Sequence, residues 1–117
     1  MRIISETRLR EFWESRKGDS QASRRDLTIW RRTVRACQWR NFGELRMTFR
    51  SADSVGNCTV FNVGANRFRL IARVFFSKKK LYVLKIMDHE EYDRNMWPRE
   101  CNCHRPPPML NPPRLFD

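Results

Sequence analysis

The sequence predicts a small α+β domain in which a helical hairpin packs on an antiparallel sheet. Two observations carry this prediction. Apolar residues recur every three or four positions over residues 6–37, and they recur at every second position over residues 58–88. The chain has 117 residues, a length typical of one domain, and 40% of them are hydrophobic. That fraction is enough for a small core and argues against general disorder.

The N-terminal third of the chain is expected to form a strand and two helices. Residues 2–4 are a short apolar run that suits a strand, and Ser5 is a good N-cap for a helix over residues 6–16. Ser23 followed by Asp26 has the form of a capping motif for the second helix. The apolar stripe of that helix consists of Leu27, Trp30, Val34 and Cys37. Two consecutive helices with a short connection predict an antiparallel hairpin.

The second half of the chain predicts a meander of three strands, over residues 59–63, 67–76 and 81–88. The connection Gly64-Ala65-Asn66 suits a hairpin, provided that Ala65 keeps a negative φ. One face of the middle strand is apolar and should meet the helices; it consists of Phe68, Leu70, Ala72, Val74 and Phe76. On the last strand, the same alternation places Tyr82, Leu84, Ile86 and Asp88 on one face. Residues 90–93 are expected to close the domain with a helical turn.

All six prolines fall between Pro98 and Pro113, and proline disfavours both helices and central strands. We therefore expect a folded domain over residues 1–93 and an extended or disordered tail over residues 94–117. Without an export signal, a disulfide framework is not expected. The tail also holds three soft metal ligands, but no second ligand cluster completes a zinc site, so neither a metal nor a cofactor is expected. These ligands are Cys101, Cys103 and His104.

Positive charge is the strongest feature of the composition. The chain has 24 Lys and Arg against 13 Asp and Glu, a net charge of +11, and 19 of the basic residues are arginine. Such an excess predicts a polyanionic partner, because the planar guanidinium matches phosphate geometry; a charged surface that only aids solubility is the alternative. No apolar run approaches the roughly 20 residues that span a membrane. Since the first residues also lack the apolar stretch of a signal peptide, we expect a cytoplasmic protein.

The alternation of the middle strand places Arg67, Arg69 and Arg73 on the face away from the helices. If the last strand pairs beside it, Lys85 and His89 lie near these arginines. A face of this kind can bind RNA, whose 2′-OH is a built-in nucleophile, so that cleavage needs only positioning, proton transfer and positive charge at the phosphate. The alternative is a face whose like charges are simply hydrated.

Several segments together resemble a known family. They are Arg2-Ile3-Ile4-Ser5, Leu9-Arg10-Glu11-Phe12-Trp13, Phe49-Arg50-Ser51-Ala52-Asp53, the stretch from Val60 to Leu70, and His89-Glu90-Glu91-Tyr92-Asp93. Over residues 1–93 the chain resembles the HigB-type toxins of type II toxin–antitoxin modules, which belong to the RelE-like superfamily of mRNA interferases. The resemblance implies a RelE-like α+β fold and metal-independent endonucleolytic cleavage of mRNA on the ribosome, which inhibits translation. It also implies a partner, a helix-turn-helix antitoxin of the HigA type.

The resemblance also implies roles for individual residues. Arg69 and Arg73 would contact the scissile phosphate, and His89 would be the acid or base. Tyr92 and Lys85 would assist catalysis. Apart from the resemblance, we expect Arg50, Arg67 and Lys85 to bind RNA. Two other interpretations stay open. One is a basic RNA- or ribosome-binding protein without catalysis, and the other is an inactive relative that retains only its partner.

Overall fold

The structure, a computed structural model, describes residues 1–104 and confirms the α+β class. Five strands form a single sheet in the order β1-β5-β4-β3-β2. The strands are β1 (Arg2–Ile4), β2 (Asp53–Val55), β3 (Cys58–Val63), β4 (Phe68–Phe75) and β5 (Lys80–Asp88). Strands β2 to β5 form an antiparallel meander, while β1 pairs in parallel with β5 at one edge.

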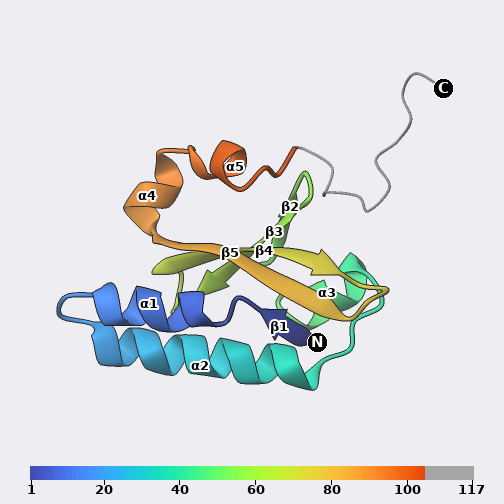
Figure 1. Ribbon diagram of the computed structural model, residues 1–117, viewed down its shortest axis with the longest axis horizontal. Helices are drawn as coiled ribbons and strands as arrows, with labels where there is room; N and C mark the ends of the chain where they lie inside the picture. Colours follow the sequence, from blue (N-terminus) through green and yellow to red (C-terminus); the bar gives the residue numbers. More distant parts are fainter. Residues whose placement is uncertain (105–117) are drawn as a thin grey trace.

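The helices are α1 (Thr7–Ser15), α2 (Ser20–Ala36), α3 (Phe42–Thr48), α4 (His89–Asp93) and α5 (Trp97–Glu100). The antiparallel hairpin of α1 and α2 covers one face of the sheet, and α4 and α5 lie on the other side (Figure 1). The molecule therefore has three layers, with the sheet in the middle. The second helical layer was not expected from the sequence.

Both expected helix caps differ from the observed ones. Helix α1 has Glu6 at its N-cap, while Ser5 adopts a left-handed φ of 65° and accepts a hydrogen bond from the Arg8 amide at 3.1 Å. Helix α2 begins before Ser23, whose hydroxyl donates to the Asp19 carbonyl at 2.8 Å. A serine inside the first turn can satisfy its hydroxyl on the backbone in this way, so the capping motif was a wrong indication of the helix start.

The main core lies between the sheet and the α1–α2 hairpin, as the alternation of β4 predicts. Phe61 of β3 is fully buried there and meets the rings of Trp30 and Phe49 edge-to-face, with centroids 5.4 Å and 5.0 Å away. On β4, Phe68 contacts Phe12 of α1 at 5.1 Å. Aromatic contacts of this geometry add to the free energy gained from burial alone.

The faces of β5 differ from the sequence expectation because the strand contains a bulge. The register with β4 shifts between Ile71 and Ala72, and Leu84 is the extra residue. Leu81 and Val83 therefore join the main core, and Tyr82 points to the opposite face, where it packs against Phe75. A period of two cannot reveal such a shift. Strand β2, which pairs with β3, was also not expected from the sequence.

The β3–β4 hairpin has three consecutive residues with positive φ: Gly64 (65°), Ala65 (54°) and Asn66 (70°). The expectation of a negative φ at Ala65 is therefore wrong, and this residue carries the steric cost of a left-handed conformation. Glycine is required at position 64, because a Cβ there would lie 2.9 Å from an Asp26 carboxylate oxygen.

Residues 94–104 do not form the extended segment that we expected. Pro98 lies in the first turn of α5, a position that tolerates proline. Trp97 and Cys103 are buried against the sheet face opposite the α1–α2 hairpin, in a second apolar cluster that includes Ile71. A disulfide joins Cys103 to Cys58. Burial of these apolar side chains outweighs the effect of the prolines. The rest of the expected tail, residues 105–117, lies outside the described residues.

Candidate functional site

Arg69 lies near the beginning of β4, directly across from Met87 of β5. Its guanidinium donates to the carbonyl of Asn66 at 2.9 Å and to that of Phe68 at 3.3 Å. The same group lies 5.1 Å from the centroid of the Tyr92 ring, within the range of a cation–π contact. These contacts hold the charge at the end of the sheet where β5 runs into α4.

His89 is the first residue of α4, and the helix start fixes its position. The Asp88 carboxylate caps the helix by accepting from the Glu91 amide at 2.9 Å. His89 Nδ1 lies 3.1 Å from an Asp93 carboxylate oxygen, and its Nε2 lies 3.4 Å from Nη2 of Arg69. A guanidinium cannot accept a hydrogen bond, whereas a carboxylate can only accept. The arrangement therefore favours the tautomer whose Nδ1–H donates to Asp93 and whose Nε2 accepts from Arg69.

Tyr92 follows His89 by one helical turn and completes this group. Its ring stacks on Trp97 of α5, with centroids 5.4 Å apart and an angle of 15° between the planes. We call Arg69, His89, Tyr92 and Asp93 the Arg69 cluster. The structure thus brings together three of the four residues predicted to be catalytic. Sequence reasoning missed Asp93 and Trp97; the spacing of four residues from His89 to Asp93 was the available signal.

Arg73 and Lys85 are not part of this cluster. Arg73 is four residues beyond Arg69 on the same strand, a separation of about 13 Å. It donates to the Asn102 carbonyl at 2.9 Å. Lys85 lies between two carboxylates, 2.8 Å from Glu91 and 3.0 Å from Glu100. The hydrogen bond to Glu91, the larger of these effects, raises the pKa of Lys85 above its usual value. Both cations are therefore engaged by α4 and by the segment that follows it.

Arg67 lies on the other side of the sheet, and the expectation that it shares a face with Arg69 is wrong. Its guanidinium pairs with the carboxylate of Asp26, lies 3.5 Å from that of Asp19, and stacks 4.8 Å from the centroid of Phe68. It precedes β4, so the alternation of that strand does not govern it. Arg50 is exposed in the turn between α3 and β2. Neither residue contacts the Arg69 cluster within residues 1–104.

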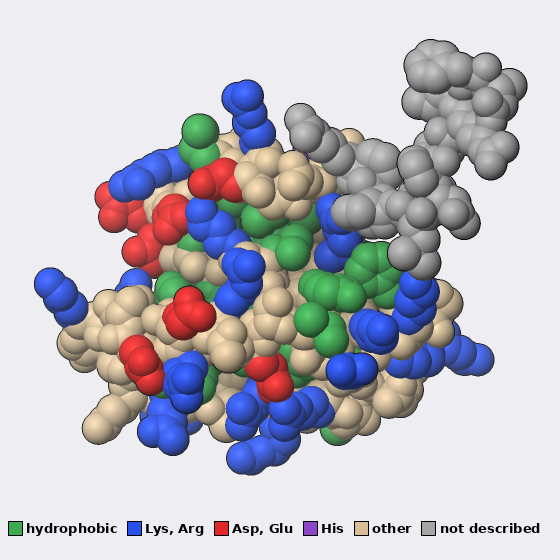
Figure 2. Space-filling view, in the orientation of Figure 1, with side chains coloured by type: hydrophobic (Ala, Val, Ile, Leu, Met, Phe, Trp, Pro, Cys, Tyr) green, Lys and Arg blue, Asp and Glu red, His purple; other side chains and the backbone are tan. Residues whose placement is uncertain are grey.

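The charge of the surface is uneven. Lys and Arg side chains gather over the α1–α2 hairpin at the bottom of the view, whereas acidic side chains gather over α4 (Figure 2). Within residues 1–104, no helix has the length and apolar character needed to cross a membrane.

The Arg69 cluster can bind and polarise a phosphate. The guanidinium offers donors in a fork that fits phosphate oxygens, and the adjacent imidazole offers an acceptor for a proton. Tyr92 adds an aromatic face and a hydroxyl within the same group. A phosphodiester bound here would lie beside a positive charge, from Arg69, and beside a proton acceptor for its neighbouring hydroxyl, from His89.

Comparison with known proteins identifies the family of the chain. Residues 23–95 match the family HigB_toxin, described as the RelE-like toxic component of a toxin–antitoxin system. The chain is also 53% identical over 34 residues to the mRNA interferase toxin HigB of Escherichia coli (strain K12) and to the mRNA interferase HigB of Shigella flexneri. That segment is 29% of this chain and 33% of each relative, so the match spans about a third of the relatives' length. The family match covers more than half of the chain and includes the whole Arg69 cluster: the chain belongs to the HigB toxin family.

Proposed function

We propose that this protein is the toxin of a type II toxin–antitoxin module and that it cleaves mRNA endonucleolytically while the message is translated. The observation that carries the proposal is the contact of Arg69 with His89 and Tyr92 at one end of the sheet. Membership of the HigB family supports it, as does the name mRNA interferase given to the relatives.

In the proposed reaction, His89 Nε2 accepts the proton of the 2′-OH, and the 2′ oxygen attacks the adjacent phosphorus. The bond from phosphorus to the 5′ oxygen then breaks, and the 5′ oxygen takes up a proton from water. The proton on His89 Nε2 returns to solvent, so that the products are a 2′,3′-cyclic phosphate and a 5′-hydroxyl. Asp93 stabilises the positive imidazolium through Nδ1, at a distance of 3.1 Å in the free protein. Arg69 stabilises the extra negative charge of the phosphorane, since an arginine stays charged at any physiological pH.

Tyr92 offers its hydroxyl to the phosphate or its ring to a neighbouring base. Aromatic side chains commonly hold single-stranded RNA by stacking on splayed bases. The Trp97 ring stacked beside it fixes the orientation of the Tyr92 side chain. We assign Tyr92 to positioning of the RNA and not to charge stabilisation.

The proposed partners are translated mRNA, the ribosome and an antitoxin of the HigA helix-turn-helix type, all in the cytoplasm. The net charge of +11 favours binding to ribosomal RNA as well as to the message. The Lys and Arg side chains that gather over the α1–α2 hairpin (Figure 2) do not belong to the Arg69 cluster. They are available for such contacts while the cluster acts on the scissile phosphate.

Induced in cells without an antitoxin, the wild-type protein is expected to arrest growth and to fragment mRNA, and Arg69→Ala is expected to be tolerated. Loss of one positioned donor to the developing charge lowers a rate by about 10²–10³-fold. The measurement is viable count together with mapping of mRNA ends. Arg46→Ala is the matched control, because Arg46 is exposed on α3, outside the α1–α2 hairpin, and donates to the Arg50 carbonyl at 3.3 Å. Equal toxicity of all three proteins would instead indicate a basic RNA-binding protein without catalysis.

Cleavage is expected to need no divalent metal, because the 2′-OH supplies the nucleophile and Arg69 supplies the positive charge. The test is the rate of mRNA cleavage on purified ribosomes over a range of EDTA concentrations that leaves the ribosomes intact. We expect the rate to stay within about two-fold of its initial value, since no step of the proposed chemistry uses a Lewis acid. A loss of activity that Mn²⁺ or Mg²⁺ restores at constant ribosome integrity would contradict the proposed chemistry.

A further inference from the structure

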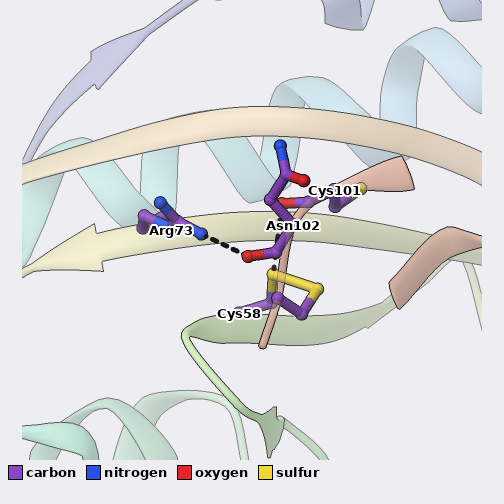
Figure 3. The surroundings of a disulfide bond; sticks show 5 residues. Cys58, Arg73, Cys101 and Asn102 are labelled. Carbon is purple, nitrogen blue, oxygen red and sulfur yellow. Dashed lines mark hydrogen bonds between the residues drawn. A yellow bond between two sulfur atoms is a disulfide. The ribbon is translucent and has the colours of Figure 1, made fainter. Parts of the chain in front are cut away.

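Residues 97–103, which we call the strap, cross the sheet face on which Arg69 and Arg73 lie. The strap continues beyond the region that matches the family, which ends at residue 95. Its end is tied to β3 by the disulfide between Cys58 and Cys103, whose Cα atoms are 5.1 Å apart although 45 positions separate them in the sequence. Figure 3 shows the bond beside β4, with Arg73 directed toward the strap.

The strap occupies two of the cations that the sequence assigns to RNA. Asn102 uses its backbone carbonyl to accept from Arg73 at 2.9 Å, and Glu100 binds Lys85 at 3.0 Å (Figure 3 shows the first contact). The Nε of Arg73 is buried and finds no hydrogen-bond partner among the described residues. A buried donor without a partner costs free energy, so the contact with the strap leaves part of the Arg73 guanidinium unsatisfied.

The β2–β3 turn is shaped to receive the end of the strap. Gly56 has a φ of 57°, and a Cβ at this position would lie 2.1 Å from the Cys103 carbonyl oxygen. The Asn57 amide donates to that same oxygen at 2.5 Å. Any residue larger than glycine would push the strap away, so this closed arrangement depends on a specific residue of the turn.

We propose that Cys58 and Cys103 are a redox-modification site that sets how many cations this face offers to RNA. With the disulfide formed, the strap holds Arg73 and Lys85. With the disulfide reduced, the end of the strap separates from β3 and frees Arg73 for phosphate contacts. The inference rests on the proposed function only in naming RNA as the ligand. A protein that acts on translated mRNA works where thiols are kept reduced, and disulfides that form there are typically redox-sensing.

The exchange is a two-electron reaction with a dithiol. One thiolate of the dithiol attacks a sulfur of the Cys58–Cys103 bond, the other thiolate resolves the mixed disulfide, and the dithiol becomes a cyclic disulfide. Its two protons end on Cys58 and Cys103. Both cysteines are buried, so the exchange requires local opening of the strap. Cys101 is a poor internal competitor, because burial raises the pKa of its thiol.

The test compares oxidised and dithiol-reduced wild-type protein, and Cys103→Ser, in binding a short fluorescent 2′-O-methyl oligoribonucleotide, which lacks the nucleophile and is not cut. We expect the reduced protein and Cys103→Ser to bind the oligoribonucleotide about 5-fold more tightly than the oxidised wild-type protein does. One charge-assisted contact near the surface increases affinity by roughly this factor. The slope of log K against log salt should steepen by about 0.7 for each cation released. Arg73→Ala should remove the difference between the redox states, and Cys37→Ser is the control that keeps it.

Equal affinities and salt slopes in the two redox states of folded wild-type protein would overturn the inference, as would weaker binding after reduction. Circular dichroism identifies a variant that fails to fold. In that case the comparison of oxidised with reduced wild-type protein tests the inference without the variant. Cleavage of unmodified mRNA on ribosomes is measured in parallel. If the protein cleaves mRNA but its affinity does not depend on redox state, the proposed redox control by the strap is wrong and the proposed function stands. If the affinity depends on redox state but neither state cleaves mRNA, the proposed function is wrong and the redox control stands.

Discussion

Replacing His89 with alanine is expected to lower the rate of mRNA cleavage by about 10²–10⁴-fold, the usual contribution of a general acid or base. The reason is the position of Nε2, which faces Arg69 while Nδ1 is held by Asp93. Without the ring, the described residues place no other imidazole beside the guanidinium to accept the 2′-OH proton. The measurement is the single-turnover rate of cleavage on programmed ribosomes, which separates chemistry from binding and product release.

His104 provides a matched control, because it is the other histidine of the chain and lies outside the Arg69 cluster. His104→Ala should leave the single-turnover rate within about two-fold. A second variant, Asp93→Asn, keeps the shape of the contact but not its charge, and the imidazolium formed in the reaction loses its stabilisation. We expect an intermediate loss of rate. A full rate in His89→Ala would remove this residue from the reaction.

Phe61→Ala is expected to destabilise the protein by about 3–5 kcal/mol, the range for removal of a large aromatic side chain from a core. Phe61 has no exposed surface and loses both edge-to-face contacts, with Trp30 and with Phe49. Domains of this size are stable by about 5–15 kcal/mol in total, so the variant loses roughly a fifth or more of its stability. The free energy of unfolding is measured by denaturant titration, with the disulfide kept oxidised in both proteins.

Phe75→Ala is the matched substitution on the other face of the same sheet. Phe75 is only half-buried and has one aromatic neighbour, Tyr82, at 5.5 Å. Its removal should cost about 1 kcal/mol, as for an average substitution. If the two variants lost equal stability, the centre of the core would not be at Phe61.

Alternation and helical periodicity were sufficient to predict the sheet and the helical hairpin that covers one of its faces. Phe68, Leu70 and Ala72 face the α1–α2 hairpin as expected, because only this orientation of the strand buries its apolar face. The neighbourhood of Arg69 and His89 also follows from the sequence, since antiparallel pairing of β4 and β5 places the ends of these strands together. Local patterns determine such features.

Features that depend on contacts across the molecule were not predictable in this way. The partner of Cys58 lies 45 residues away in a proline-containing segment, and no local pattern identifies it. The strap it anchors engages Arg73, which alternation alone leaves on an open face. Arg67 is a similar case, because the charge of Asp26 on α2 determines where its guanidinium lies. The orientation of a charged side chain depends on where its oppositely charged partner lies in the fold.

Attack of the 2′ oxygen on the adjacent phosphorus, promoted by the Arg69 cluster, determines which chemical groups remain at the cut ends. We expect each cleavage of mRNA by the wild-type protein to leave a 5′-hydroxyl on one fragment and a 2′,3′-cyclic phosphate or 3′-phosphate on the other. A message with a 2′-deoxynucleotide at the scissile position should stay intact. Fragments with a 5′-phosphate and a 3′-hydroxyl, or cleavage of the deoxy-substituted message, would contradict the account.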